Sequence, residues 1–107
     1  MSNYSWISEK IKKKSIYFSQ HELAWKISDA NEFIEDALKN EVIVLGGDIL
    51  DSNMNYTCDN WYYEPDRSIE RKVNSNRSCN CMKEYIDNYV KLNGTDYYVI
   101  IVCVTIF

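Results

Sequence analysis

The chain has 107 residues, of which 46% are hydrophobic and 26% charged; this is the composition of a globular domain and it excludes a disordered tail. We expect one domain over residues 1–107, because a chain of this length buries roughly 65% of the surface that its unfolded form exposes. Within the net charge of −4, residues 29–66 hold ten acidic residues and one lysine, a net −9, which repels a phosphate backbone and argues against nucleic acid as a ligand.

The first 14 residues have no apolar stretch of the kind that a secretion signal needs. The longest apolar run, residues 97–104, is too short to cross a bilayer. We therefore expect a cytoplasmic protein without membrane contact. Because that compartment keeps thiols reduced, the four cysteines are expected to be free.

The N-terminal third predicts two helices separated by an extended segment. Residues 5–14 carry apolar side chains at helical spacing, and residues 16–27 predict a loop that leads into a short strand. Asp29 and Glu32 have the three-residue separation of a reciprocal helix cap. Apolar residues then recur at offsets of three and four, which predicts a helix over residues 30–40.

The middle third predicts a β-hairpin. Residues 42–45 form a β-branched run that indicates a buried strand, which ends at two glycines and resumes after a kink at residues 49–50. A turn cluster follows at residues 51–55, and the aromatic stretch 56–63 is expected to pair with the first strand.

The C-terminal third predicts one helix and the central strand. A polar loop over residues 64–76 leads into a helix that begins near residues 75–78 and ends at Gly94. Residues 97–107 are apolar on both faces and are expected to lie centrally, covered on both sides. The elements together predict an α+β fold, with a sheet of three or four strands, antiparallel or mixed, packed with two or three helices.

Residues that carry chemistry are sparse. His21 has no second histidine at ligand spacing, and Cys79 and Cys81 would point about 200° apart on a helix, so we expect no metal and no cofactor. Asp48 and Asp59 are the one candidate carboxylate pair, as in a small hydrolase. Acids beside a turn more often bind backbone amides, and we favour that structural interpretation.

The aromatic strand allows two interpretations. Alternation places Asp59, Trp61 and Tyr63 on one face. If this face is buried, Asp59 must accept hydrogen bonds, because an unpaired carboxylate in a core costs several kcal/mol. If it is exposed, the aromatic residues beside acids have the composition of a protein-binding hot spot. For Trp61 alone, a place in the core is an equally good interpretation.

Short motifs in the middle of the chain add a family resemblance. An aliphatic strand ends in Gly46-Gly47-Asp48, a turn leads to Asp59-Asn60-Trp61, and a later helix carries the pair Tyr85-Ile86. In this order the motifs resemble the immunity protein 40 family of bacterial polymorphic toxin systems, with the similarity covering residues 23–89.

The resemblance implies a protein that is not an enzyme and that binds a cognate toxin domain, blocking its active site or substrate path. The acidic segment would steer a basic toxin, such as a nuclease, and the aromatic residues would slow dissociation. We expect a monomer or a weak homodimer; a hydrolase and an adaptor that dimerises through its C-terminal strand are the alternatives. The predicted toxin-binding residues are Asp48, Asp59, Trp61, Tyr63 and Glu64, with Gly46, Gly47 and Asn60 as a structural motif.

Overall fold

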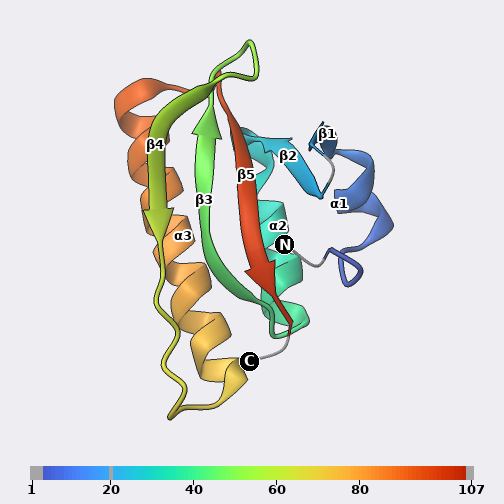
Figure 1. The fold of residues 1–107 in the computed structure, drawn as a ribbon, viewed down its shortest axis with the longest axis vertical. Helices are drawn as coiled ribbons and strands as arrows, with labels where there is room; N and C mark the ends of the chain where they lie inside the picture. Colours follow the sequence, from blue (N-terminus) through green and yellow to red (C-terminus); the bar gives the residue numbers. More distant parts are fainter. Residues whose placement is uncertain (1–3, 20, 106–107) are drawn as a thin grey trace.

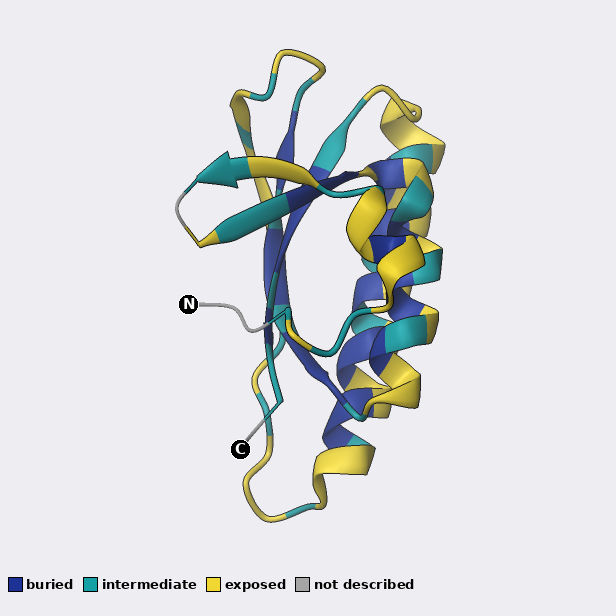
Figure 2. Ribbon diagram, turned by 90° about the vertical axis from the view of Figure 1, so that its right-hand side faces the viewer, coloured by how far each residue is buried: buried dark blue, intermediate teal, exposed yellow. Residues whose placement is uncertain are grey.

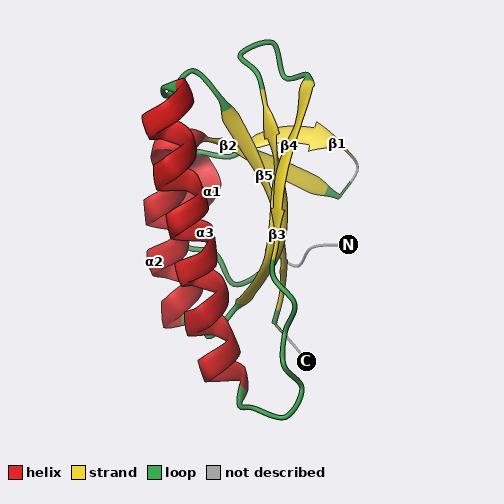
Figure 3. Ribbon diagram, turned by 90° about the vertical axis from the view of Figure 1, so that its left-hand side faces the viewer, coloured by secondary structure: helices red, strands yellow, loops and turns green. Residues whose placement is uncertain are grey.

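The structure is a computed structural model that describes residues 4–19 and 21–105. Five strands form one antiparallel sheet in the order β1-β2-β5-β3-β4, and the helices lie on one of its faces (Figures 1 and 3). The elements are α1 (Glu9–Lys13), β1 (Ile16–Ser19), β2 (Glu22–Lys26), α2 (Ala30–Lys39), β3 (Ile43–Leu50), β4 (Tyr56–Tyr62), α3 (Arg71–Asn93) and β5 (Tyr98–Val104). The predicted α+β class is confirmed, whereas the expected three or four strands are wrong, because the sheet has five.

The additional strand comes from the N-terminal region. Residues 16–27, expected to hold one strand, form the antiparallel pair β1 and β2. In β1, Ile16 is 36% exposed and Tyr17 is 70% exposed. Because neither is buried, the sequence of β1 shows no alternation of apolar and polar residues that would predict a strand. β2 carries a stronger signal because Ala24 and Trp25 are fully buried, and it pairs with β5.

The main core fills the space between the sheet and the two long helices (Figure 2). The predicted helix is confirmed as α2, which buries Ala30, Phe33, Ile34 and Ala37. The predicted cap is wrong: Asp29 makes no capping bond, and Glu32 instead accepts from Lys14 at 2.9 Å. The carboxylate that the sequence spacing assigned to the helix cap is thus paired with a lysine from the preceding segment.

α3 begins at Arg71, several residues earlier than expected. The sequence prediction missed its first turns because they bury polar side chains. Asn74 is fully buried; its side-chain oxygen accepts from the Tyr63 hydroxyl and from the Asp66 amide, each at 2.9 Å. Ser78 is equally buried and accepts from the Val44 amide at 2.9 Å. These bonds satisfy backbone and side-chain groups in the core, so a stretch with a polar composition forms a helix.

β5 is the third of five strands, which confirms its predicted central position and shows that it is not an edge strand. Its predicted cover on both faces holds in part: the helices pack on one face only (Figure 3), while on the other face Ile100 is fully buried and Val102 is half-buried. We call the opposite side the open face. A small cluster there, built on Ala24, Leu50 and Ile100, is packed by Phe18, Met54 and Tyr98. Among the described residues, no helix combines the length and apolarity that a membrane span requires.

Candidate functional site

The two glycines lie inside β3, where the chain cannot accept a side chain. A Cβ at Gly46 would be 2.3 Å from the Trp61 carbonyl oxygen, and its φ of +152° is unfavourable for other residues. A Cβ at Gly47 would be 2.3 Å from the Ile100 carbonyl oxygen and 2.4 Å from the Trp61 ring. The strand continues through both glycines instead of ending there, with a register shift between Val44 and Gly46. Their predicted structural role follows from these close approaches.

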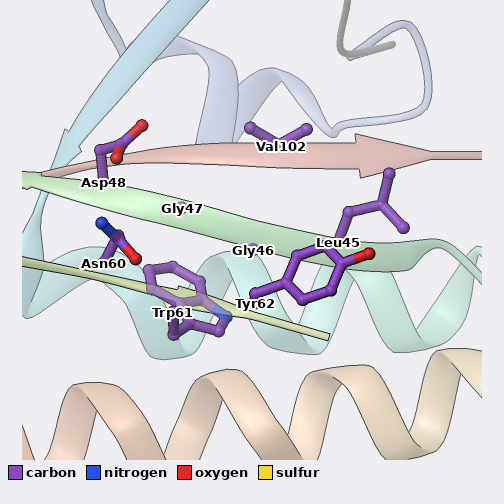
Figure 4. Close-up of a pocket in the computed structure, with 8 residues that line it drawn as sticks. All are labelled: Leu45, Gly46, Gly47, Asp48, Asn60, Trp61, Tyr62 and Val102. Atoms are coloured by element: carbon purple, nitrogen blue, oxygen red, sulfur yellow. The ribbon is translucent and has the colours of Figure 1, made fainter. Parts of the chain in front are cut away.

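Both glycines line a groove of about 360 Å³, which we call the glycine groove (Figure 4). One end is apolar, with Leu45, Tyr62 and Val102 around Gly46, and the other end is polar, with Asp48 and Asn60 (Figure 4). Tyr62 is 69% exposed, so the groove is open to a partner from outside. The complete lining is Leu45, Gly46, Gly47, Asp48, Asn60, Trp61, Tyr62 and Val102.

The predicted aromatic face of β4 turns toward the helices. Trp61 is 7% exposed and stacks on Tyr85 with ring centroids 5.1 Å apart, which confirms the interpretation of Trp61 as a core residue. Asp59 is exposed and accepts from the Tyr89 hydroxyl at 2.8 Å, so its carboxylate is not in the core. Burial and this bond raise the pKa of Tyr89 to about 12. The Tyr63 hydroxyl donates to Asn74.

Asp48 and Glu64, unlike Asp59, Trp61 and Tyr63, make no hydrogen bond or ring contact with the helices among the described residues. Asp48 is half-buried and belongs to the polar end of the glycine groove, where it lies opposite Asn60 in the ladder between β3 and β4. Glu64 is exposed and accepts a short hydrogen bond from the Tyr62 hydroxyl, which raises the pKa of Tyr62. The structure thus brings Asp48, Asn60 and both glycines together in one groove with Trp61, and it places Glu64 in contact with the groove residue Tyr62.

Asp48 lies in an environment that disfavours the charged form of its carboxyl. Burial raises the pKa of its carboxyl, and the negative charge of Glu22 raises it further. The pKa of Tyr56 is raised by burial and by the same two carboxylates, so the three groups share one region of the open face. No hydrogen bond or ion pair connects the Asp48 carboxylate to another described residue, which leaves its charge uncompensated in the free protein.

Most other acids of the segment 29–66 already have partners. Asp29 and Glu32 pair with Lys14, and Glu41 pairs with Arg71. Asp36 accepts from the Ser8 amide. The others that interact locally are Asp51 with the Asn53 and Asn55 amides, Asp59 with Tyr89, and Asp66 with Ser68. The net −9 of the sequence is therefore distributed over several surfaces.

The proposed acid pair does not form. Asp48 lies on the open face, whereas Asp59 is bonded to α3 on the helix side, and strand alternation keeps the two carboxylates on opposite sides of the sheet. All four cysteines are free, and His21 is exposed. Within the part of the chain that the structure describes, no three His, Cys, Asp or Glu side chains gather where they could hold a metal ion.

Three groove residues were absent from the sequence prediction: Leu45, Tyr62 and Val102. Alternation had placed Tyr62 on the face of β4 opposite Trp61, and that assignment is correct. The sequence does not indicate which of the two aromatic faces of β4 is buried, because Trp61 and Tyr62 are adjacent and both are large and apolar.

Comparison with known proteins identifies a family. The family model described as Immunity protein 40 matches residues 14–103, which is most of the chain and includes both glycines, β4 and the whole of α3. No curated protein and no solved structure matches the chain significantly.

Proposed function

Because the chain belongs to the immunity protein 40 family, we propose that it binds a cognate toxin of a bacterial polymorphic toxin system and neutralises it as a stoichiometric complex, without catalysis. The family match over residues 14–103 is the observation that carries this proposal. In this role the protein acts in the cytoplasm, where it protects the cell that carries it, and its partner is a basic toxin domain such as a nuclease.

We place the toxin contact on the open face, around the glycine groove. This face leaves large side chains at its surface, with Tyr56 at 55% and Tyr62 at 69% exposure, and tyrosine is enriched where proteins bind one another. Asp48 and Glu64 supply negative charge at the same surface. Charge complementarity of this kind raises the association rate with a basic partner.

Asp59, Trp61 and Tyr63 have a different part in this proposal. Each is engaged by α3, through Tyr89, Tyr85 and Asn74 respectively. They hold β4 against the helix, so that Tyr62 and Asn60 face the partner. Substituting them weakens toxin binding by disturbing β4.

The test uses candidate toxin domains, beginning with any that is encoded beside this gene. A cell that expresses the toxin domain alone is expected to stop growing, and co-expression of this protein is expected to restore growth. The purified proteins are expected to form a one-to-one complex when their mass is measured in solution after gel filtration. A folded protein that neither restores growth nor forms this complex contradicts the proposal.

The same assay separates an inhibitor from an enzyme. A stoichiometric inhibitor protects only when its concentration reaches that of the toxin, so toxin activity should fall linearly to zero at a ratio of one. Complete protection at a ratio far below one would indicate turnover and would refute the binding mechanism.

A further inference from the structure

The glycine groove is an open hollow along β3 that is long enough for one extended side chain. Along β3 it runs from Gly46 to Asp48, a separation of two residues, or roughly 7 Å in an extended strand. Apolar groups of Leu45, Val102 and Tyr62 form one end and the Asp48 carboxylate forms the other (Figure 4). A matching ligand is apolar over its length and positively charged at its tip.

The carboxylate at the polar end has no partner among the described residues. Asp48 is half-buried, has a carboxylate neighbour in Glu22 and has no described hydrogen-bond or ion-pair partner for its side chain. The smaller hollow between α1 and α2 differs in this respect: it holds Lys10 and Lys39 beside its acids, and Lys10 pairs with Glu32 at 3.9 Å. Of these two hollows, the glycine groove is therefore the one that joins an apolar channel to an uncompensated carboxylate.

We infer that the glycine groove receives an arginine side chain of the toxin, with the guanidinium at Asp48 and the carbon stem along Gly46 between Tyr62 and Val102. This inference rests on the proposed function and names the chemistry of the partner at that site. An arginine fits because its stem packs on apolar surface while its head remains polar. Tyr62 can pack on the stem, and the planar head donates several hydrogen bonds in one plane, which suits the Asp48 carboxylate at the tip.

The complex also changes the state of Asp48. A guanidinium within hydrogen-bond distance favours the charged carboxylate, so the raised pKa of Asp48 in the free protein should fall when the toxin binds. Binding is then coupled to loss of a proton from this carboxyl at acidic pH. An aliphatic anchor from the toxin in the same groove would raise the pKa of Asp48 instead, because it would bury the carboxylate without a counter-charge.

The experiment measures the Kd of three single-substitution variants of this protein for the toxin domain. Asp48→Asn removes the groove charge with little change of shape, and Val102→Phe fills the channel without changing charge. Glu35→Gln removes one charge from an exposed position on α2 and serves as the control for general electrostatic steering. Circular dichroism and urea denaturation establish that each variant is folded.

Asp48→Asn and Val102→Phe are each expected to raise the Kd for the toxin domain by about tenfold or more, mainly through faster dissociation. Glu35→Gln is expected to change Kd by less than about twofold. In a double-mutant cycle, Asp48→Asn should couple with substitution of one surface arginine of the toxin and with no other. Carbon-13 NMR of the Asp48 carboxyl should show a lower pKa in the complex.

Several outcomes would overturn the inference. If Asp48→Asn binds as tightly as the wild-type protein, or if no arginine of the toxin couples with it, the groove does not receive that side chain while the proposed function stands. If Asp48→Asn changes self-association and leaves toxin affinity unaltered, the occupant is a second copy of this chain. If the wild-type protein does not bind the toxin domain at all, the proposed function fails and this inference fails with it.

Discussion

Gly47→Ala is the sharpest structural test of the groove, because the added methyl group would meet two rigid neighbours. Its Cβ would lie 2.3 Å from the Ile100 carbonyl oxygen and 2.4 Å from the ring of Trp61, whereas non-bonded carbon atoms are most favourable at about 3.5–4.0 Å. The carbonyl belongs to β5, the central strand, and Trp61 is held by its stack on Tyr85. Neither neighbour can withdraw without a shift of the sheet.

The expected destabilisation follows from these two clashes. Overpacking a core costs about 1–3 kcal/mol where side chains can adjust, and here one obstacle is backbone, so we expect a loss of about 3 kcal/mol or more. A domain of this size has a total stability of roughly 5–15 kcal/mol. With a urea slope of about 1–2 kcal/mol per M, the unfolding midpoint should fall by roughly 1.5–3 M.

Gly94→Ala provides the control in a urea denaturation series. Nothing lies within 4 Å of a Cβ at Gly94, but its φ of +87° and ψ of −170° lie in a region that is essentially restricted to glycine, so this substitution costs only backbone strain of about 1–3 kcal/mol. Gly47 has no such φ, so Gly94→Ala gives the size of a loss from backbone strain alone, while Gly47→Ala reports the two clashes. If Gly47→Ala loses less than about 1 kcal/mol, the close packing of Trp61 and β5 on this glycine is not the reason for it.

Three further predictions concern the residues around the groove. Trp61→Ala should lower the free energy of unfolding by about 3–5 kcal/mol in thermal or urea denaturation, and a loss below about 1 kcal/mol would contradict its place in the core. Tyr89→Phe removes the hydroxyl bonded to Asp59 and should cost about 1 kcal/mol, whereas an unchanged midpoint would show that water replaces the bond. Asp48 has a pKa raised above 3.8, so its folded form holds a proton more tightly and stability falls as pH rises through that range. Asp48→Asn should therefore be more stable than the wild-type protein at neutral pH, with a difference that vanishes below about pH 3; equal stability at both pH values would contradict this reasoning.

The sequence predicted α2 and the β3–β4 hairpin because their patterns are local. The stripe of α2 and the turn between the strands depend on residues within ten positions of one another. α3 and β1 were predicted less well for opposite reasons. The start of α3 buries polar side chains such as Asn74, whose bonds to the chain near Tyr63 exist only in the folded protein. β1 is largely exposed, so its side chains show no apolar alternation from which its pairing with β2 could be predicted.

The residues of the proposed binding face could be predicted only up to a choice between two faces. Alternation in β4 separated Trp61 from Tyr62 correctly, but both faces carry an aromatic residue. The choice is made by Gly47, which leaves room for the Trp61 ring, and by Tyr85, which stacks on that ring from α3. Tyr85 lies 24 positions after Trp61 in the chain, and no local pattern reports that contact.

The groove and the core are two consequences of the same two glycines. Gly47 gives Trp61 its space on the helix side, and Gly46 leaves the open face without a side chain between Tyr62 and Val102. A substitution at Trp61 will therefore weaken binding by loosening β4 against α3, and loss of binding in that variant does not identify a contact with the toxin. Tyr62 is the residue that separates the two effects, because it is 69% exposed and forms part of the groove. Tyr62→Ala should lose affinity at nearly constant stability, whereas Trp61→Ala should lose both together.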